Sequence, residues 1–98
     1  MYGVIQRCTF NPEMSDRLYL RIKEELIPIL LQTPGFIACY WLESGPDAST
    51  VLGIFESQVN AESFLGRFTA FAQKGLALLP VNHDISHGEV KTYVVCGL

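Results

Sequence analysis

The fold is decided by the stretch from Thr33 to Phe55, which reads TPGFIACYWLESGPDASTVLGIF. The proline-glycine pair at its start ends a preceding helix, because neither residue continues one well. The runs Phe36–Leu42 and Thr50–Phe55 are short, apolar and rich in aromatic and β-branched residues, which is typical of strands. The turn-forming residues of Glu43–Ser49 lie between them, so the stretch predicts a β-hairpin. Gly53 interrupts the second strand and indicates a bulge or close packing against a helix.

The residues before this hairpin predict a strand followed by a long helix. Tyr2–Phe10 has strand composition. Asn11 and Pro12 then provide a capping side chain and a ring already set at a helical φ, so we expect a helix from Pro12 to Gln32. Pro28 should kink or break the last turn. One apolar stripe at helical spacing identifies the buried face, and it consists of Leu18, Ile22, Leu26 and Ile29.

The residues after the hairpin predict a second helix and a last strand. Ser57 or Asn60 begins the helix, and Pro80 stops a further turn at Leu76–Leu79. We expect Val81–Gly88 to be a polar connection and Val90–Cys96 to be the last strand. The core positions of the helix recur at helical spacing, at Ala61, Phe64 or Leu65, Phe68 and Phe71 or Ala72.

The order β-α-β-β-α-β predicts a single α+β domain over residues 1–98. Right-handed crossovers give a ferredoxin-like fold, in which both helices cover one face of a four-stranded antiparallel sheet of order 4-1-3-2. Ninety-eight residues are too few for two domains of usual size.

Composition excludes several classes of function. Seven Lys and Arg residues against ten Asp and Glu residues give a net charge of −3, which disfavours nucleic-acid and membrane-surface partners. No apolar run is long enough to span a membrane, and no signal-peptide pattern opens the chain. Three widely separated cysteines favour neither disulfides nor a zinc site, so we expect a cytoplasmic protein.

Two helices cannot cover both faces of this sheet. Strict alternation would place Phe36, Ala38, Tyr40 and Leu42 on one face and Ile37, Cys39 and Trp41 on the other, so both faces are apolar. Exposure of several such side chains costs several kcal/mol at ~25 cal/mol per Å². We therefore expect a homodimer in which the second sheet covers the first.

With these elements in place, the chain resembles the dimeric α+β-barrel superfamily and most closely the antibiotic-biosynthesis-monooxygenase-like domains. The resemblance covers nearly the whole chain. It rests on Asn11-Pro12-Glu13 after the first strand, on Pro34-Gly35-Phe36, on the hairpin, and on Ile54-Phe55-Glu56-Ser57 leading to Ala61. It implies a small oxygenase or a haem-degrading enzyme with a pocket between sheet and helices, and it implies no metal or flavin cofactor for the oxygenase.

The resemblance also implies site residues. The strand-one amide of such proteins falls at Gln6, which we take as the candidate catalytic residue, and their second-helix tryptophan falls at Phe64 or Leu65. From side-chain chemistry, Tyr40, Trp41 and Tyr93 could line a pocket for a phenolic or quinone-like ligand, or could belong to the sheet core and dimer interface. Phe64 and Phe68 are helix core and could wall the same pocket.

Three further groups have two interpretations each. His83 and His87 have the spacing of two metal ligands on a helix, but their polar surroundings favour solvated loop histidines, and we expect no metal site. Arg7 pairs with Glu89 or Glu43 if buried, or else holds a ligand carboxylate. The cysteines are interpreted as buried, unreactive thiols rather than as catalytic nucleophiles, which would need a nearby base or positive charge.

Two functions from different classes stay open. The first is a cofactor-independent monooxygenase acting on a small aromatic or polyketide-like substrate. The second is a non-enzymatic dimeric module that binds a small apolar or aromatic ligand or assists another protein. Haem binding through His83 or His87 is a third possibility.

Overall fold

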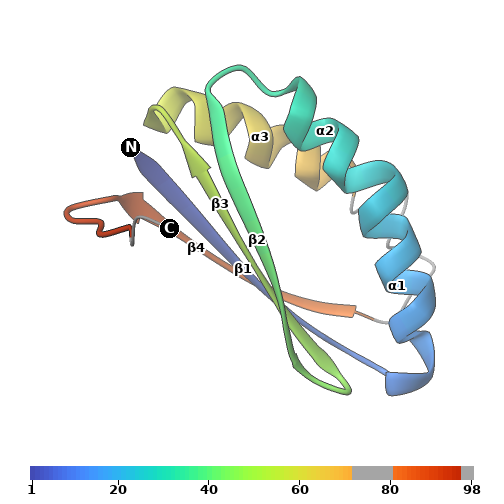
Figure 1. Ribbon diagram of the computed structural model, residues 1–98. Helices are drawn as coiled ribbons and strands as arrows, with labels where there is room; N and C mark the ends of the chain where they lie inside the picture. The colour runs from blue at the N-terminus through green and yellow to red at the C-terminus, as the bar shows by residue number, and fades with distance from the viewer. Residues whose placement is uncertain (72–80, 96–98) are drawn as a thin grey trace.

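The computed structural model describes the backbone of residues 1–71 and 81–95, and the side chains of residues 1–70 and 84–95. Four strands, β1 (Tyr2–Phe10), β2 (Phe36–Gly45), β3 (Ala48–Phe55) and β4 (Val81–Glu89), form one antiparallel sheet. Their order is β2-β3-β1-β4, which confirms the predicted order 4-1-3-2. The helices lie over one face of this sheet, as predicted for an α+β ferredoxin-like fold (Figure 1).

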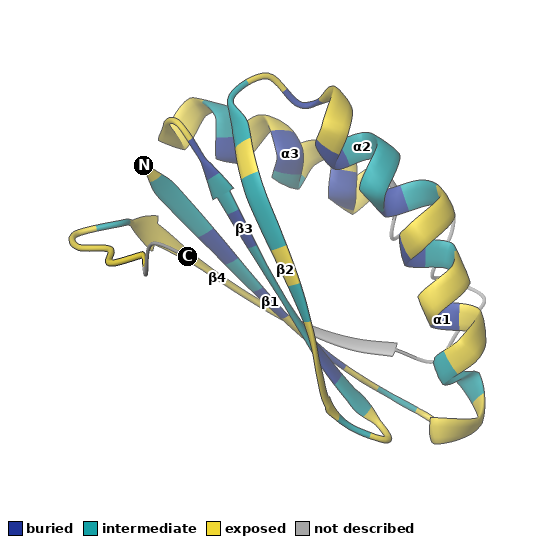
Figure 2. Cartoon of the chain, viewed as in Figure 1, coloured by how far each residue is buried: buried dark blue, intermediate teal, exposed yellow. Residues whose placement is uncertain are grey.

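The alternation of buried side chains along β1 shows which face of the sheet is covered. Val4, Gln6 and Cys8 are buried on the helix side, whereas Arg7 and Thr9 are exposed on the other side. β3 repeats the alternation, with Ser49, Gly53 and Phe55 buried (Figure 2). A side-chain period of two is expected for strands covered on one face only.

The first helix is a continuous arm of four segments that spans the predicted Pro12–Gln32. These segments are a 3-10 turn (Pro12–Met14), α1 (Ser15–Arg21), a π-helical segment η2 (Ile22–Leu26) and α2 (Ile27–Gln32). The Asn11 side chain caps it by accepting a hydrogen bond from the Glu13 N–H at 3.1 Å. Of the kink or break predicted at Pro28, the break does not occur, because Pro28 lies in the first turn of α2, where its missing N–H is tolerated.

The π-helical segment changes which residues of the arm are buried. Leu18, Ile22, Leu26 and Leu30 are buried at a constant spacing of four, and Leu30 takes the place predicted for Ile29. In a regular α-helix such residues drift by about 40° at each step. The Ile27 N–H bonds to the Ile22 carbonyl five residues earlier, and this wider turn offsets the drift.

Helix α3 (Gln58–Phe71) packs against the sheet with the residues predicted for it. Ser57 is the cap, because its Oγ accepts from the Asn60 N–H at 3.3 Å. Ala61, Phe64 and Phe68 are buried, and the Phe64 ring stacks on Phe55 with centroids 5.4 Å apart. The predicted further turn at residues 76–79 lies outside the described residues. No helix among the described residues is long and apolar enough to cross a membrane.

The hairpin is longer than predicted, since only Pro46 and Asp47 form its turn. A register irregularity between Phe36 and Ala38 turns Phe36 toward the helices, so strict alternation assigned it to the wrong face. Gly53 marks no bulge. The predicted close packing is against an aromatic ring and not against a helix. A Cβ at Gly53 would lie only 3.1 Å from the Phe55 ring.

The predicted last strand is wrong. The strand that pairs with β1 is Val81–Glu89, which the sequence interpretation treated as a connection, whereas residues 90–95 have no regular structure. Every described side chain of β4 is exposed. An edge strand held by backbone hydrogen bonds needs no apolar run, so its polar composition concealed it.

Candidate functional site

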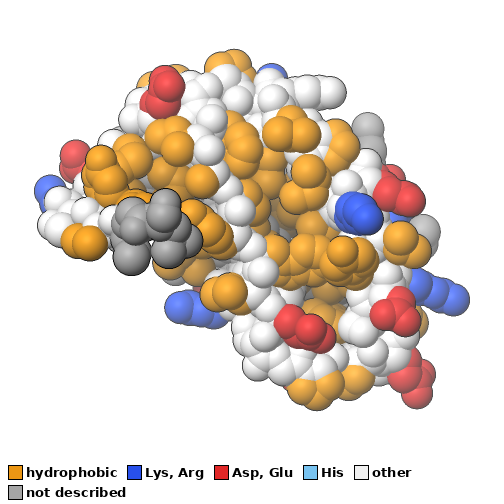
Figure 3. Space-filling model, viewed as in Figure 1, with side chains coloured by type: hydrophobic (Ala, Val, Ile, Leu, Met, Phe, Trp, Pro, Cys, Tyr) orange, Lys and Arg blue, Asp and Glu red, His pale blue; other side chains and the backbone are white. Residues whose placement is uncertain are grey.

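A hollow opens between the first half of the helical arm and the far ends of β2 and β3. Its volume is about 350 Å³, within the ~300–1,000 Å³ typical of small-ligand sites. Hydrophobic side chains gather along the gap between the sheet and the arm (Figure 3). We call it the outer hollow, and its lining residues are Phe10, Ser15, Asp16, Leu18, Tyr19, Trp41, Glu43 and Ser49.

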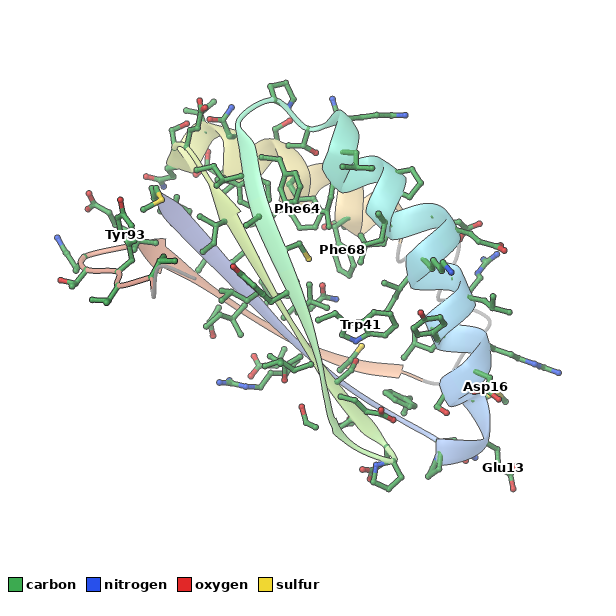
Figure 4. All side chains as sticks on the ribbon, viewed as in Figure 1. Glu13, Asp16, Trp41, Phe64, Phe68 and Tyr93 are labelled. Atoms are coloured by element: carbon green, nitrogen blue, oxygen red, sulfur yellow. The ribbon has the colours of Figure 1, made fainter. Side chains whose placement is uncertain are left out.

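Two aromatic rings form one wall of the outer hollow. Trp41 points from β2 toward the arm (Figure 4), where its ring stacks on Tyr19 of α1 with centroids 4.9 Å apart and planes inclined by 23°. Tyr19 is half exposed, so the pair borders the opening. A flat aromatic ligand could extend such a stack, since offset stacking adds about 0.5–1.5 kcal/mol beyond burial.

Deeper between the layers lies a second, much smaller space, which we call the inner cavity. Its volume is about 10 Å³, enough for about one water molecule. Leu18 and Ser49 line both spaces and therefore separate them. The lining of the inner cavity consists of Gln6, Cys8, Leu18, Ile22, Leu26, Ser49, Val51 and Phe68.

Two buried polar atoms at this junction have no hydrogen-bond partner within the described part of the chain. They are Trp41 Nε1, a donor, and Ser49 Oγ, which can donate or accept. Ser49 is only 4% exposed. Buried polar groups are normally paired with protein, ordered water or a ligand, so these two atoms indicate a place for a polar group from outside the described residues.

The thiols near the site are not activated. Burial raises the pKa of Cys8 to about 11 and also raises the pKa of Cys39. A raised pKa leaves little thiolate near neutral pH, and the thiolate is the nucleophile. The interpretation of Cys8 and Cys39 as unreactive thiols is consistent with this environment.

The structure brings two of the candidate site residues together. Gln6 is buried on β1 at 7% exposure, and both Gln6 and Phe68 line the inner cavity. Phe64 packs in the core against Phe55 and lines neither the inner cavity nor the outer hollow. Whether any of them acts on a ligand stays a prediction.

Tyr40 and Tyr93 lie away from both spaces. Tyr40 is 61% exposed at the edge strand β2, where it borders a separate apolar groove beside α2. Period-two alternation sends its side chain away from that of Trp41. Tyr93 is 68% exposed and follows β4, because the strand predicted around it does not form.

The histidine spacing no longer supports a metal site, since His83 and His87 lie on a strand. Residues four apart on a strand are separated by about 13 Å, too far to share one ion. The Tyr2 hydroxyl and His87 Nδ1 are 2.6 Å apart in a hydrogen bond. Among residues 1–70 and 84–95, no group of three or more His, Cys, Asp or Glu side chains could hold a metal.

Arg7 is exposed on the face of the sheet away from the helices, opposite Asp84 of β4 in register. Arg7 is therefore not the buried charge that the predicted pairing with Glu89 or Glu43 assumed. Within the described part of the chain, Arg7 forms a salt bridge with neither Glu43 nor Glu89, and Glu89 instead lies 3.6 Å from Lys91.

The sequence interpretation missed the polar lining of the outer hollow. It assigned Glu43 and Ser49 to a turn and did not identify Asp16 as a lining residue. A turn made of Pro46 and Asp47 alone would have indicated that both strands are longer than predicted. Alternation along the longer β2 then puts Glu43 on the same face as Trp41, and the observed register pairs Glu43 with Ser49.

No protein-family model matches the sequence. No curated protein matches it either. Solved structures do match over nearly the full chain. A protein from Deinococcus radiodurans proposed to be an antibiotic biosynthesis monooxygenase has a TM-score of 0.83 and 15% identity, covering 99% of both chains.

Two further similar structures contain ligands. A monooxygenase from Streptomyces coelicolor, solved with nanaomycin D, has a TM-score of 0.77 and 14% identity, covering 98% of this chain and 92% of that one. A mutant of MhuD, with two manganese protoporphyrin IX molecules per active site, has a TM-score of 0.75 and 18% identity, covering 98% and 100%. This chain has the antibiotic-biosynthesis-monooxygenase-like fold. The fold implied by the sequence resemblance is confirmed.

Proposed function

We propose that this antibiotic-biosynthesis-monooxygenase-like protein is a cofactor-independent monooxygenase that acts on a small, electron-rich aromatic substrate in the outer hollow. The observation that carries the proposal is the joint presence of an aromatic-walled hollow of about 350 Å³ and a buried amide, Gln6, behind it. The same fold occurs in a Streptomyces monooxygenase solved with nanaomycin D.

The proposed reaction needs no redox group from the protein, because the substrate supplies the electrons. An anthrone-type CH₂ transfers a proton to solvent water and gives an electron-rich anion that reduces O₂. One oxygen atom then becomes the new carbonyl, and the other leaves as water. The Gln6 amide would stabilise the anionic oxygen electrostatically from the inner cavity, past Leu18 and Ser49, and the apolar surroundings would strengthen that interaction.

Oxygen uptake with anthrone and hydroquinone substrates tests this proposal. We expect uptake by the purified protein, and a decrease of about 10²–10³-fold in Gln6→Ala if the amide stabilises the anion. Gln58→Ala removes an exposed amide that donates to Glu62 and is the matched control. No turnover with any substrate, together with unchanged aromatic binding in Gln6→Ala, would contradict the proposal.

The alternative is a non-enzymatic module that binds the same aromatic ligands. It is favoured by the small size of the inner cavity, because Gln6 reaches the outer hollow only past Leu18 and Ser49. This alternative predicts aromatic binding without oxygen uptake, and equal affinity in Gln6→Ala. Native mass spectrometry of the purified protein with a panel of aromatics measures that binding directly.

We further propose that the protein is a cytoplasmic homodimer. The uncovered face of the sheet supports the dimer, because Tyr40 and Leu42 are 61% and 59% exposed there and Ile5, Leu52 and Ile54 are only partly buried. Burial against a second copy would remove this apolar surface from water. Sedimentation equilibrium at micromolar concentration should give twice the chain mass, and a monomer would contradict the proposal.

A further inference from the structure

We infer that the outer hollow selects hydroxylated aromatic ligands that carry a positively charged amine and rejects those that carry a carboxylate. The inference rests on the proposed function only in placing an aromatic ligand in this hollow. It adds a charge requirement that the fold does not imply. Two independent features of the lining support it: the charge of its walls, and its polar atoms without partners.

The two charged side chains that the structure describes in the lining of the outer hollow are both acidic. Asp16 projects from α1 and Glu43 from β2, so they approach the space from the two sides that enclose it. Among the described residues, the lining contains no lysine, arginine or histidine. A ligand cation is therefore attracted from both walls, and a ligand carboxylate is repelled by both.

The deep end of the hollow fits an uncharged polar group of the ligand rather than a cation. Ser49 Oγ is buried and lacks a partner within the described residues, as does Trp41 Nε1 on the adjacent strand. A phenolic hydroxyl can accept from the indole N–H and exchange a hydrogen bond with the serine. A ligand with a hydroxyl at one end and an amine at the other therefore matches both ends.

The same charges disfavour a porphyrin, because its propionates are carboxylates. Haem added to the protein should then give no Soret shift that depends on the outer hollow. This separates the chain from the porphyrin-bound structure that shares its fold.

A pair of ligands that differ only in charge tests the inference. Tyramine and 4-hydroxyphenylacetate share a phenol and differ in an amine against a carboxylate, and p-cresol is the neutral reference. We expect tyramine to bind at least about tenfold more tightly than 4-hydroxyphenylacetate at low ionic strength, with a smaller ratio at high salt. Calorimetry gives the affinities, and fluorescence of Trp41, the single tryptophan of the chain, locates the ligand.

Neutral variants connect the preference to the two carboxylates. The double variant Asp16→Asn with Glu43→Gln should lose the preference while still binding p-cresol. Glu13→Gln is the matched control, because Glu13 lies one turn earlier on the arm and points away from the hollow (Figure 4).

Each outcome of this experiment has one meaning. A preference for tyramine that the double variant loses and Glu13→Gln keeps supports the inference. Binding of p-cresol with equal affinity for both charged ligands, or a preference that survives in the double variant, overturns the inference and leaves the proposed function standing. Failure of all three phenols to bind overturns both.

Discussion

The two ends of the space between helices and sheet differ in how they are filled. Under α3, the Phe64 ring contacts both Phe55 and Phe68, and Phe55 is completely buried. Beside α1, Trp41 and Tyr19 enclose about 350 Å³ of open space with acidic residues around it. The same two layers thus build a packed core at one end and a ligand-sized hollow at the other. We expect stability to depend on the α3 end and binding to depend on the α1 end.

The largest effect on stability is expected at Phe55. Phe55→Ala should lower the free energy of unfolding by about 3–5 kcal/mol, because it leaves a cavity among Phe36, Phe64 and the sheet. Urea denaturation followed by circular dichroism measures the change. Val59→Ala, at an exposed position of α3, is the control and should change stability by less than about 0.5 kcal/mol. A loss below about 1 kcal/mol for Phe55→Ala would show that the α3 end is not the core.

Cys8 lies between the two ends and gives the next effect. Because burial raises its pKa from 9.0 to about 11, its thiolate fraction at pH 8 falls about a hundredfold. Iodoacetamide at pH 8 should therefore label Cys8 at least a hundredfold more slowly in the folded protein than in urea, by peptide mapping. Equal rates in both conditions would mean that the inner cavity is open to solvent.

The same shift makes stability depend on alkaline pH. Burial raises the pKa of Cys8 in the folded state, so its contribution to the free energy of unfolding is fully present below about pH 9. That contribution is lost as the pH rises toward about 11. The difference in unfolding free energy between the wild type and Cys8→Ala should be constant below pH 9 and should change above it. A constant difference up to pH 11 would contradict the raised pKa.

Tyr19 should have a smaller effect on stability than Phe55. Tyr19→Ala removes a half-exposed ring and its stack on Trp41, so we expect a loss of about 1 kcal/mol. Thermal unfolding measures it, and phenol affinity should fall in the same variant. If stability fell as much as in Phe55→Ala, the α1 end would be core rather than a ligand site.

The smallest effect is expected for Asp16→Asn. This exposed substitution should change the unfolding free energy by less than about 0.5 kcal/mol while weakening tyramine binding. Unfolding and calorimetry on the same sample give both values. A large loss of stability with unchanged tyramine affinity would assign Asp16 to the structure and not to the ligand.

The sequence was sufficient for the parts of the fold that bury apolar side chains in a regular pattern. The hairpin, both helices and the strand order followed from apolar periodicity and the two βαβ units. β4 did not, because an edge strand with Asp84, Ser86 and Gly88 on its open face is held by its backbone and shows no apolar signal. Val90–Cys96 has strand composition, but residues 90–95 pair with no strand of the described sheet.

The site was less predictable than the fold. Gln6 was a candidate because the family resemblance implies an amide at its position, and the structure places it on the buried side of β1. Asp16, Glu43 and Ser49 depend on where the hairpin turn falls and on how far α1 stands from β2. Neither the position of the turn nor the separation of α1 from β2 is encoded by a local sequence pattern. Only the structure shows that these three residues lie around one hollow.

The π-helical segment Ile22–Leu26 has a consequence for how the arm performs two tasks. The additional residue in this wider turn acts like an insertion. It changes the rotation of the second half of the arm about the helix axis relative to the first half. The second half keeps Leu26 and Leu30 on the core, while the first half holds Asp16 and Tyr19 over the hollow. Deletion of one residue here would rotate one half by about 100° relative to the other. Core and binding wall could then no longer face the sheet at the same time.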